Sequence, residues 1–254
     1  MKLLDIVKEA GEILKSGYYG SKDIRFKSEV DLVTEYDLKI ENFLKRKISK
    51  LYPDFEIVAE ESFYGDKIPS KAIFIDPIDG TTNFIHSIAY TSISIGLWEN
   101  NRPIKGVVYN PILDELFWAK SGKGAFLNGK KIVVSQTQDL QNSLLATGFP
   151  YTKFQRGKDF EWVVKCLENL LPKTRDIRRL GSAAIDLCYV ACGRFSGFYE
   201  INLKPWDIAA GILILKEAGG KIYNHKGQEY KFGDIIVATN GKIDKELIEN
   251  LANY

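Results

Sequence analysis

The segment 71–84 constrains the fold of this chain more than any other stretch. It begins as a short apolar, β-branched run, which is typical of a buried strand, and a proline and a glycine then break the pattern. Asp76 and Asp79 stand where the strand ends, and buried carboxylates are costly unless a cation meets them. The turn can direct both carboxylates and the Ile78 carbonyl to one point. An all-oxygen ligand set suits a hard cation, above all Mg²⁺.

The residues after this turn suggest a site for an anion. Gly80 has no side chain that would block a close approach, and Thr81 and Thr82 follow it. If a short helix starts here, its free N–H groups form an anion site beside the metal. A metal and an anion together indicate phosphate chemistry. The alternative is that Asp79 and Gly80 form an ordinary turn and that Asp76 caps a helix.

The whole string D-P-I-D-G-T-T-N-F at 76–84 resembles the signature of the inositol monophosphatase family. This family belongs to the superfamily of metal-dependent, lithium-sensitive sugar phosphatases. The resemblance implies an α+β fold in which helices and two sheets alternate as a layered αβαβα sandwich, as in fructose-1,6-bisphosphatase. It also implies an active site between two lobes, two or three Mg²⁺ ions per site, inhibition by Li⁺ and a homodimer.

The composition is that of a globular protein, with 254 residues of which 45% are hydrophobic and 27% charged. Lysine and arginine total 35 against 33 acidic residues, so a net charge of +2 gives no case for direct nucleic-acid binding or an anionic membrane partner. No apolar run reaches the length of a membrane span, and acidic residues near the N-terminus argue against an export signal. We therefore expect a cytoplasmic protein.

Hydrophobic periodicity divides the chain into two lobes, 1–137 and 138–254. The first lobe should contain two helices and an antiparallel sheet, and most of the metal ligands. The second should alternate strands and helices. The predicted helices are 3–14, 35–51, 160–170, 182–192, 205–218 and one from 244, and the predicted strands are 55–59, 91–98, 104–109, 115–119, 144–147, 177–180, 195–201 and 235–238.

Glu60 and Glu61 follow a predicted strand, and adjacent side chains on extended backbone point in opposite directions. Only one of them should reach a shared metal. The string A-E-E-S at 59–62 resembles a family motif, and the resemblance implies Glu61 as the ligand and part of the catalytic machinery. The alternative is a solvated acidic pair.

The resemblance also implies how the metals are shared. Glu61, Asp76 and the Ile78 carbonyl would hold the first metal. Asp76, Asp79 and Asp207 would hold the second, and Asp207 lies in the family-like string W-D-I-A-A-G at 206–211. Without the resemblance, Asp207 would be an N-cap.

Asp37 has two predicted roles. It follows Thr34 by three residues, which approximates a capping box with aspartate in place of glutamate. The string D-L-V-T-E-Y-D at 31–37 also resembles a family motif, which implies that Asp37 bonds the catalytic Thr81. Thr81 would then position the attacking water and help to deprotonate it.

The predicted substrate contacts come from both lobes. The backbone of Gly80 and Thr81, with Thr82 beside them, would hold the phosphate. Ala183 lies in a G-S-A-A string that lines the substrate pocket in the family, and Glu200 matches an acid that bonds inositol hydroxyls. Lys27 matches a lysine that lies on a mobile loop near the metals in the family, although an exposed lysine is usually only a solubilising charge.

These features predict Mg²⁺-dependent hydrolysis of a phosphate monoester, above all myo-inositol monophosphate. One alternative is another phosphatase of the superfamily, acting on fructose 1,6-bisphosphate, a nucleotide 3′-phosphate or NADP. The string N-F-I-H at 83–86 favours the inositol branch. The other alternative is a relative with an additional regulatory role, binding a protein partner in transcription.

Overall fold

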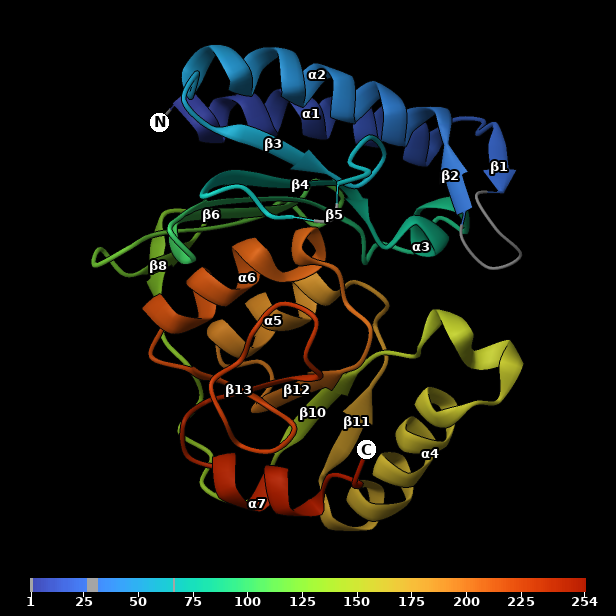
Figure 1. Ribbon diagram of the computed structural model, residues 1–254, viewed down its shortest axis with the longest axis vertical. Coiled ribbons are helices and arrows are strands. Elements are labelled where there is room, and N and C mark those ends of the chain that lie inside the picture. The colour runs from blue at the N-terminus through green and yellow to red at the C-terminus, as the bar shows by residue number, and fades with distance from the viewer. Residues whose placement is uncertain (1, 27–31, 66) are drawn as a thin grey trace.

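The computed structural model describes residues 2–26, 32–65 and 67–254. Two β-sheets alternate with three layers of helices (Figure 1). Helices α1 and α2 form one outer layer, α5 and α6 lie between the sheets, and α4 and α7 cover the far sheet. The layered α+β fold predicted from the sequence is confirmed.

The first sheet has strand order β3-β4-β5-β6-β7-β8-β9. Its strands are β3 (Glu56–Ala59), β4 (Lys71–Asp79), β5 (Ser92–Glu99), β6 (Arg102–Asn110), β7 (Glu115–Lys120), β8 (Ala125–Leu127) and β9 (Lys130–Ile132). All neighbours are antiparallel except β3 and β4, which run parallel. An antiparallel sheet was predicted here, and the observed sheet differs by one parallel pair at its edge. A long connection rather than a hairpin joins β3 to β4, which allows the two strands to run parallel.

The second sheet has strand order β11-β10-β12-β14-β13. Its strands are β10 (Leu144–Thr147), β11 (Asp176–Arg178), β12 (Gly197–Glu200), β13 (Lys221–Asn224) and β14 (Ile236–Thr239). Strands β11, β10 and β12 are parallel, whereas β14 and β13 add antiparallel pairs. The first sheet ends at Ile132 and the second begins at Leu144, and we propose that the lobes divide at 137/138 between them.

The helices are α1 (Lys2–Tyr19), α2 (Glu35–Leu51), α3 (Thr81–Ile85), α4 (Lys158–Leu170), α5 (Ala183–Ala191), α6 (Pro205–Glu217) and α7 (Asp244–Asn250), with short 3₁₀ turns η1 (Tyr151–Gln155) and η2 (Leu171–Lys173). Strands β1 (Ile24–Phe26) and β2 (Leu32–Thr34) form a small hairpin-like pair before α2. Within the described residues, none of these helices is both long and apolar enough to cross a membrane.

Buried apolar stripes hold α1 and α2 on the outer face of the first sheet. Val7, Ala10 and Leu14 of α1 recur at helical spacing, as do Ile40 and Leu44 of α2, and all five are fully buried. They pack against the isoleucines of β4 and β5. These two helices therefore anchor β4, the strand that ends in the acidic turn.

Helix α6 lies unusually close to the first sheet because two glycines face it. A Cβ on Gly96 of β5 would lie 2.8 Å from Ala209, and one on Gly106 of β6 would lie 2.6 Å from the Ala210 carbonyl oxygen. Real Cβ atoms do not approach other atoms this closely, so glycine is needed at both positions. This contact brings the N-terminal end of α6 up to β4.

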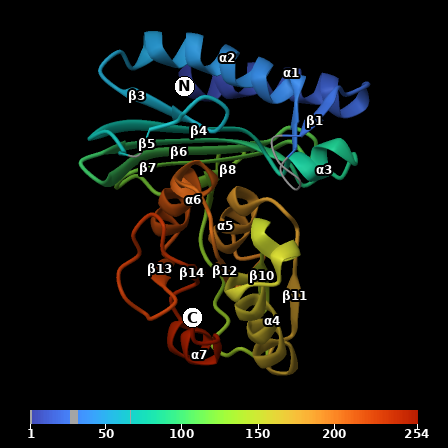
Figure 2. The same ribbon diagram turned by 45° about the vertical axis from the view of Figure 1, so that its right-hand side comes forward.

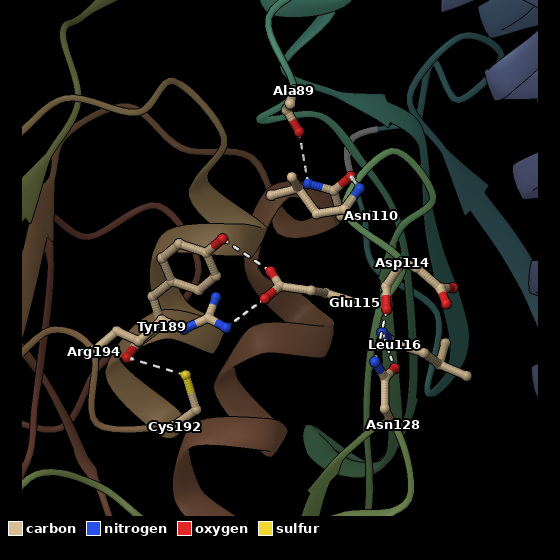
Figure 3. A network of polar contacts seen from close by, with 10 residues as sticks. Ala89, Asn110, Asp114, Glu115, Leu116, Asn128, Tyr189, Cys192 and Arg194 are labelled. Atoms are coloured by element: carbon tan, nitrogen blue, oxygen red, sulfur yellow. Dashed lines mark hydrogen bonds and ion pairs between the residues drawn. The ribbon is translucent and has the colours of Figure 1, made fainter.

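A polar network fixes α5 against the first sheet (Figure 3). Glu115 of β7 accepts hydrogen bonds from the Tyr189 hydroxyl of α5, at 2.9 Å, and from the Arg194 guanidinium. The Arg194 guanidinium also lies 4.4 Å from the centre of the Tyr189 ring. In Figure 2, α3 lies across from the segment that precedes α4. The network around Glu115 thus joins the first sheet to α5.

Candidate active site

A bulge at the end of β4 turns both aspartates toward one pocket. Asp76 pairs with Ser94 and Asp79 with Ser92, so three steps along β4 match two steps along β5. In a regular strand, residues three apart would point to opposite faces. The extra residue cancels this alternation, and Asp76, Ile78 and Asp79 all line the same pocket. The Ile78 N–H donates to Asp76 Oδ1 at 3.0 Å, which fixes that carboxylate.

Gly80 makes the turn from β4 into α3 possible. Its φ of 89° lies in the left-handed region, where a side chain is strained. A Cβ there would also lie 2.9 Å from the Tyr90 carbonyl oxygen and 3.0 Å from that of Gly181. Helix α3 begins at the next residue, so the short helix expected after the acidic turn is present and Thr81 stands at its start.

Among the described residues, five carboxylates line this pocket: those of Glu60, Asp76, Asp79 and Asp207, which are considered first, and that of Glu200. Burial and the neighbouring carboxylates of Glu60, Asp79 and Asp207 raise the pKa of Asp76 well above its usual range. Burial and Glu60 likewise raise the pKa of Asp207. These carboxylates therefore repel one another, and a bound cation is the natural way to keep them ionised together.

Of the two adjacent glutamates, the structure favours Glu60 over Glu61, the one predicted as a metal ligand. Glu60 lines the pocket and its side chain hydrogen-bonds that of Asp76. The Glu61 backbone N–H donates to Glu41 Oε2 of α2 at 2.8 Å, and Glu61 is outside the pocket lining that the described residues form. The Glu60 N–H bonds the Ile75 carbonyl, so Glu60 still continues the extended register of β3, and alternation directs it rather than Glu61 toward Asp76.

Asp79 joins the first lobe to the N-terminal end of α5. Its Oδ2 accepts hydrogen bonds from the Ser182 hydroxyl and from the Ala184 N–H, the latter at 2.8 Å. Burial raises the pKa of Asp79 to about 6, and these bonds and the Arg179 guanidinium oppose that rise. Helix N-termini stabilise negative charge, so α5 helps to hold this carboxylate in its ionised form.

Asp37 is fully buried and has both of its predicted contacts. Its Oδ2 accepts the Thr34 N–H at 2.7 Å and the Thr34 hydroxyl at 2.6 Å, which completes the capping box of α2. Its Oδ1 lies 3.3 Å from the Thr81 hydroxyl, which also lies 3.0 Å from the Ile78 carbonyl oxygen. Because a hydroxyl has one hydrogen, Thr81 donates to one of these acceptors at a time and its lone pairs stay available.

Asp207 lies in the first turn of α6, where Lys204 is the N-cap residue and Pro205 follows. Its Oδ2 accepts the Lys204 N–H at 2.7 Å. Asp207 is therefore not the N-cap that was considered as the alternative, because Lys204 holds that position, but it accepts the N-cap N–H and also lines the pocket. The close approach of α6 to the first sheet brings Asp207 to the pocket.

The other wall of the pocket comes from the second lobe. Glu200 ends β12, and burial raises the pKa of its carboxyl to about 8, against the opposing effect of Arg179. Arg179 lines the pocket and lies 5.3 Å from the centre of the Phe149 ring. Lys153 of η1 lines the pocket as well. Sequence analysis missed Arg179 and Lys153, although the basic pair that precedes the G-S-A-A string was a usable signal for Arg179.

The predicted site residues divide into three groups. Those that the structure brings to the pocket are Asp76, Ile78, Asp79, Gly80, Thr81, Thr82, Ala183, Glu200 and Asp207, with Asp37 behind Thr81. Glu60, rather than the predicted Glu61, is the glutamate of this pair that lines the pocket. Lys27 lies outside the described residues.

The donor set fits a hard cation. Four carboxylates and the Ile78 carbonyl face one pocket, and no histidine or cysteine is among its lining residues in the part of the chain that the structure describes. Among those residues, no three or more His, Cys, Asp or Glu side chains lie close enough together in this structure to hold a metal ion by themselves. Mg²⁺ is usually bound by one or two carboxylates together with several waters and substrate phosphates, so an open cluster of this kind suits it.

Comparison with known proteins identifies the family. The model of the inositol monophosphatase family matches residues 3–254. The chain belongs to the inositol monophosphatase family. Inositol monophosphatase 1 of Solanum lycopersicum is 40% identical over 98% of this chain and 92% of its own length. Inositol-1-monophosphatase of Synechocystis is 45% identical over 87% of this chain and 77% of its own.

Solved structures agree with this assignment. The extragenic suppressor protein suhB from Bartonella henselae matches with a TM-score of 0.91 and 36% identity, covering 99% of this chain and 97% of that one. The match extends across both sheets and all three helical layers, so the pocket between them is part of the shared fold.

Proposed function

We propose that this protein hydrolyses phosphate monoesters with Mg²⁺ and that myo-inositol monophosphate is its principal substrate. The observation that carries the proposal is the convergence of four carboxylates and the Ile78 carbonyl beside the Thr81 hydroxyl. Membership of the inositol monophosphatase family supports this substrate, as do its relatives in Solanum lycopersicum and Synechocystis, which are named as inositol monophosphatases.

Glu60, Asp76, the Ile78 carbonyl, Asp79 and Asp207 would hold the metal, with Glu60 taking the place first predicted for Glu61. Bound Mg²⁺ would polarise the phosphoryl oxygens and lower the pKa of water at the site. The sequence resemblance implies two or three ions per site, and inhibition by Li⁺ stays a prediction, as do the homodimer and the cytoplasmic location.

Thr81 and Asp37 would orient the attacking water. The Thr81 hydroxyl donates to Asp37 or to the Ile78 carbonyl, so an oxygen lone pair remains to accept a hydrogen bond from water. Asp37 is itself held by two bonds from Thr34, which leaves it little freedom to move. A positioned group of this kind typically contributes about 10²- to 10⁴-fold to the rate.

Glu200 and Arg179 would recognise the substrate beyond the phosphate. In its ionised form Glu200 accepts hydrogen bonds from hydroxyls, whereas Arg179 offers only donors. Gly80, Thr81 and Thr82 line the pocket, and the backbone N–H groups of Gly80 and Thr81, with Thr82 beside them, would hold the phosphate. The alcohol would thus meet the second lobe and the phosphate the first.

A panel of phosphate esters assayed with and without Mg²⁺ tests this proposal. It should contain myo-inositol 1-phosphate, fructose 1,6-bisphosphate, a nucleotide 3′-phosphate, NADP and p-nitrophenyl phosphate. We expect the highest kcat/KM for inositol phosphate and loss of activity in EDTA. A higher kcat/KM for another ester would reassign the substrate, and activity that survives EDTA would refute the metal site.

A further inference from the structure

Gly148 lies directly against the Glu200 carboxylate. A Cβ built on Gly148 would lie 1.8 Å from Glu200 Oε1, 1.9 Å from Cδ and 2.2 Å from Oε2. Real Cβ atoms do not come within 3.0 Å of other atoms, so the carboxylate occupies the space that any other side chain at 148 would need.

The register of the second sheet creates this contact. Strands β10 and β12 are parallel neighbours in which Thr147 pairs with Tyr199, and the Thr147 hydroxyl donates to the Tyr199 carbonyl at 2.9 Å. Gly148 and Glu200 are the next residues along, so they continue side by side. Residues paired in this way project their side chains to the same face of a sheet. Glu200 therefore folds across a position that has no side chain of its own.

Backbone conformation does not explain this glycine. The φ angle of Gly148 is not positive, so its backbone lies outside the left-handed region that favours glycine. What calls for glycine at 148 is instead the lack of space for a Cβ, because the Glu200 carboxylate fills the position that a Cβ would take. We propose that Gly148 is a positioning residue that sets the place of the Glu200 carboxylate and thereby the selectivity for polyhydroxylated alcohols. This inference rests on the substrate role proposed above for Glu200.

A methyl group at 148 should displace Glu200 while leaving the fold intact. The clashing atoms are the far end of a flexible side chain rather than backbone, so rotation of Glu200 can relieve the contact. To restore an ordinary contact of about 3.5 Å, the carboxylate has to move by more than 1 Å. A misplacement of about 1 Å in an oriented group can cost about 10²-fold.

The test compares Gly148→Ala with Gly157→Ala. Gly157 lies nearby in the chain, has φ of −83°, and a Cβ there meets nothing within 4 Å, so it is a matched control. The readout is the ratio of kcat/KM for myo-inositol 1-phosphate to that for p-nitrophenyl phosphate, which has no hydroxyl ring. We expect the ratio to fall about tenfold or more in Gly148→Ala and to stay within about twofold of wild type in Gly157→Ala.

The double variant Gly148→Ala/Glu200→Gln separates positioning from a general structural role. If Gly148 acts only through Glu200, the double variant should show no lower ratio than the worse single variant. A structural role would instead lower the melting temperature and reduce kcat/KM for both esters in proportion. An unchanged ratio in Gly148→Ala, or a double variant that multiplies both losses, would overturn the proposal.

A crystal structure of Gly148→Ala decides the positioning step whatever the substrate is. We expect the Glu200 carboxylate to be displaced from its wild-type place by more than 1 Å, as the contact requires. If the carboxylate stays in place, the proposal is wrong. If it moves but neither Gly148→Ala nor Glu200→Gln alters the substrate ratio, the role of Glu200 in the proposed function fails instead.

Discussion

The two ends of the pocket are built in different ways. We call Glu60, Asp76, Asp79 and Asp207 the carboxylate end, and Gly148, Arg179 and Glu200 the second-lobe wall. Three of the four carboxylates come from β4 and the residue after β3, next to each other in the first sheet. The second-lobe wall draws its members from three separate segments of the other sheet and its connections.

This difference indicates a division of labour. The carboxylate end carries surplus negative charge that a cation would balance, which serves any phosphate ester. The second-lobe wall pairs one acceptor, Glu200, with one cation, Arg179, and in the proposed function it meets the alcohol rather than the phosphate. Changes at the carboxylate end should therefore affect all substrates equally, whereas changes at the second-lobe wall should affect some more than others.

The largest effect is expected for Asp76→Asn. The change removes a buried charge at the centre of the carboxylate end, and metal ions typically supply several kcal/mol of transition-state stabilisation. We expect kcat/KM to fall by at least about 10³-fold for inositol phosphate and p-nitrophenyl phosphate alike. Steady-state assays at saturating Mg²⁺ measure this. A loss confined to one ester would break the comparison.

The second-largest effect is expected for Glu60→Gln compared with Glu61→Gln. The two glutamates are adjacent in the chain, and Glu60 is the one that lines the pocket. Glu60→Gln removes a carboxylate that contacts Asp76, so the Mg²⁺ concentration for half-maximal activity should rise by about a hundredfold. Glu61→Gln, the matched control, should change it by less than about threefold. A Mg²⁺ titration of activity checks both, and the opposite order would restore Glu61 as the ligand.

Glu200→Gln should alter selectivity. Loss of a hydrogen bond to a charged group costs about 1.5–3 kcal/mol, so the ratio of kcat/KM for inositol phosphate to that for p-nitrophenyl phosphate should fall roughly ten- to a hundredfold. The Mg²⁺ requirement should not change. Equal losses on both esters would remove the proposed distinction between the two ends.

The smallest effect concerns stability against pH. The Glu200 pKa is raised from 4.5 to about 8, so the folded state holds a proton that the unfolded state releases, and stability falls as pH rises through that interval. Glu200→Gln cannot lose this proton. Its melting temperature relative to wild type should therefore increase between pH 5 and pH 8.5, by about 2–4 °C for each kcal/mol. Calorimetry in EDTA tests this, and a constant difference would contradict it.

Features that depend on local sequence were predictable, and those that depend on register across the fold were not. The capping box of Thr34 and Asp37 follows from spacing alone and is present. The structure favours Glu60 over Glu61, and the sequence could not decide between them because alternation fixes which neighbour faces the pocket only when the phase of β3 is known.

The second-lobe wall shows the same limit. Gly148 faces Glu200 only because β10 pairs with β12 in the register that places Thr147 opposite Tyr199. These two residues are 52 positions apart in the chain. Its backbone conformation is ordinary, so no turn or left-handed signal marks it in the sequence. Arg179 likewise lies against the Phe149 ring and against Gly181, contacts that its place in the sequence does not reveal.

Calorimetric titration of Mg²⁺ into wild type and Asp76→Asn, with inorganic phosphate present in both, tests the central claim most directly. Titration of the wild-type protein should give a heat of Mg²⁺ binding at the carboxylate end. The Asp76→Asn variant should give no such heat, although it should still unfold in a cooperative transition. The variant should also unfold at a higher temperature than wild type in EDTA, because one of four mutually repelling carboxylates is neutral. Equal Mg²⁺ binding by both proteins would contradict the account.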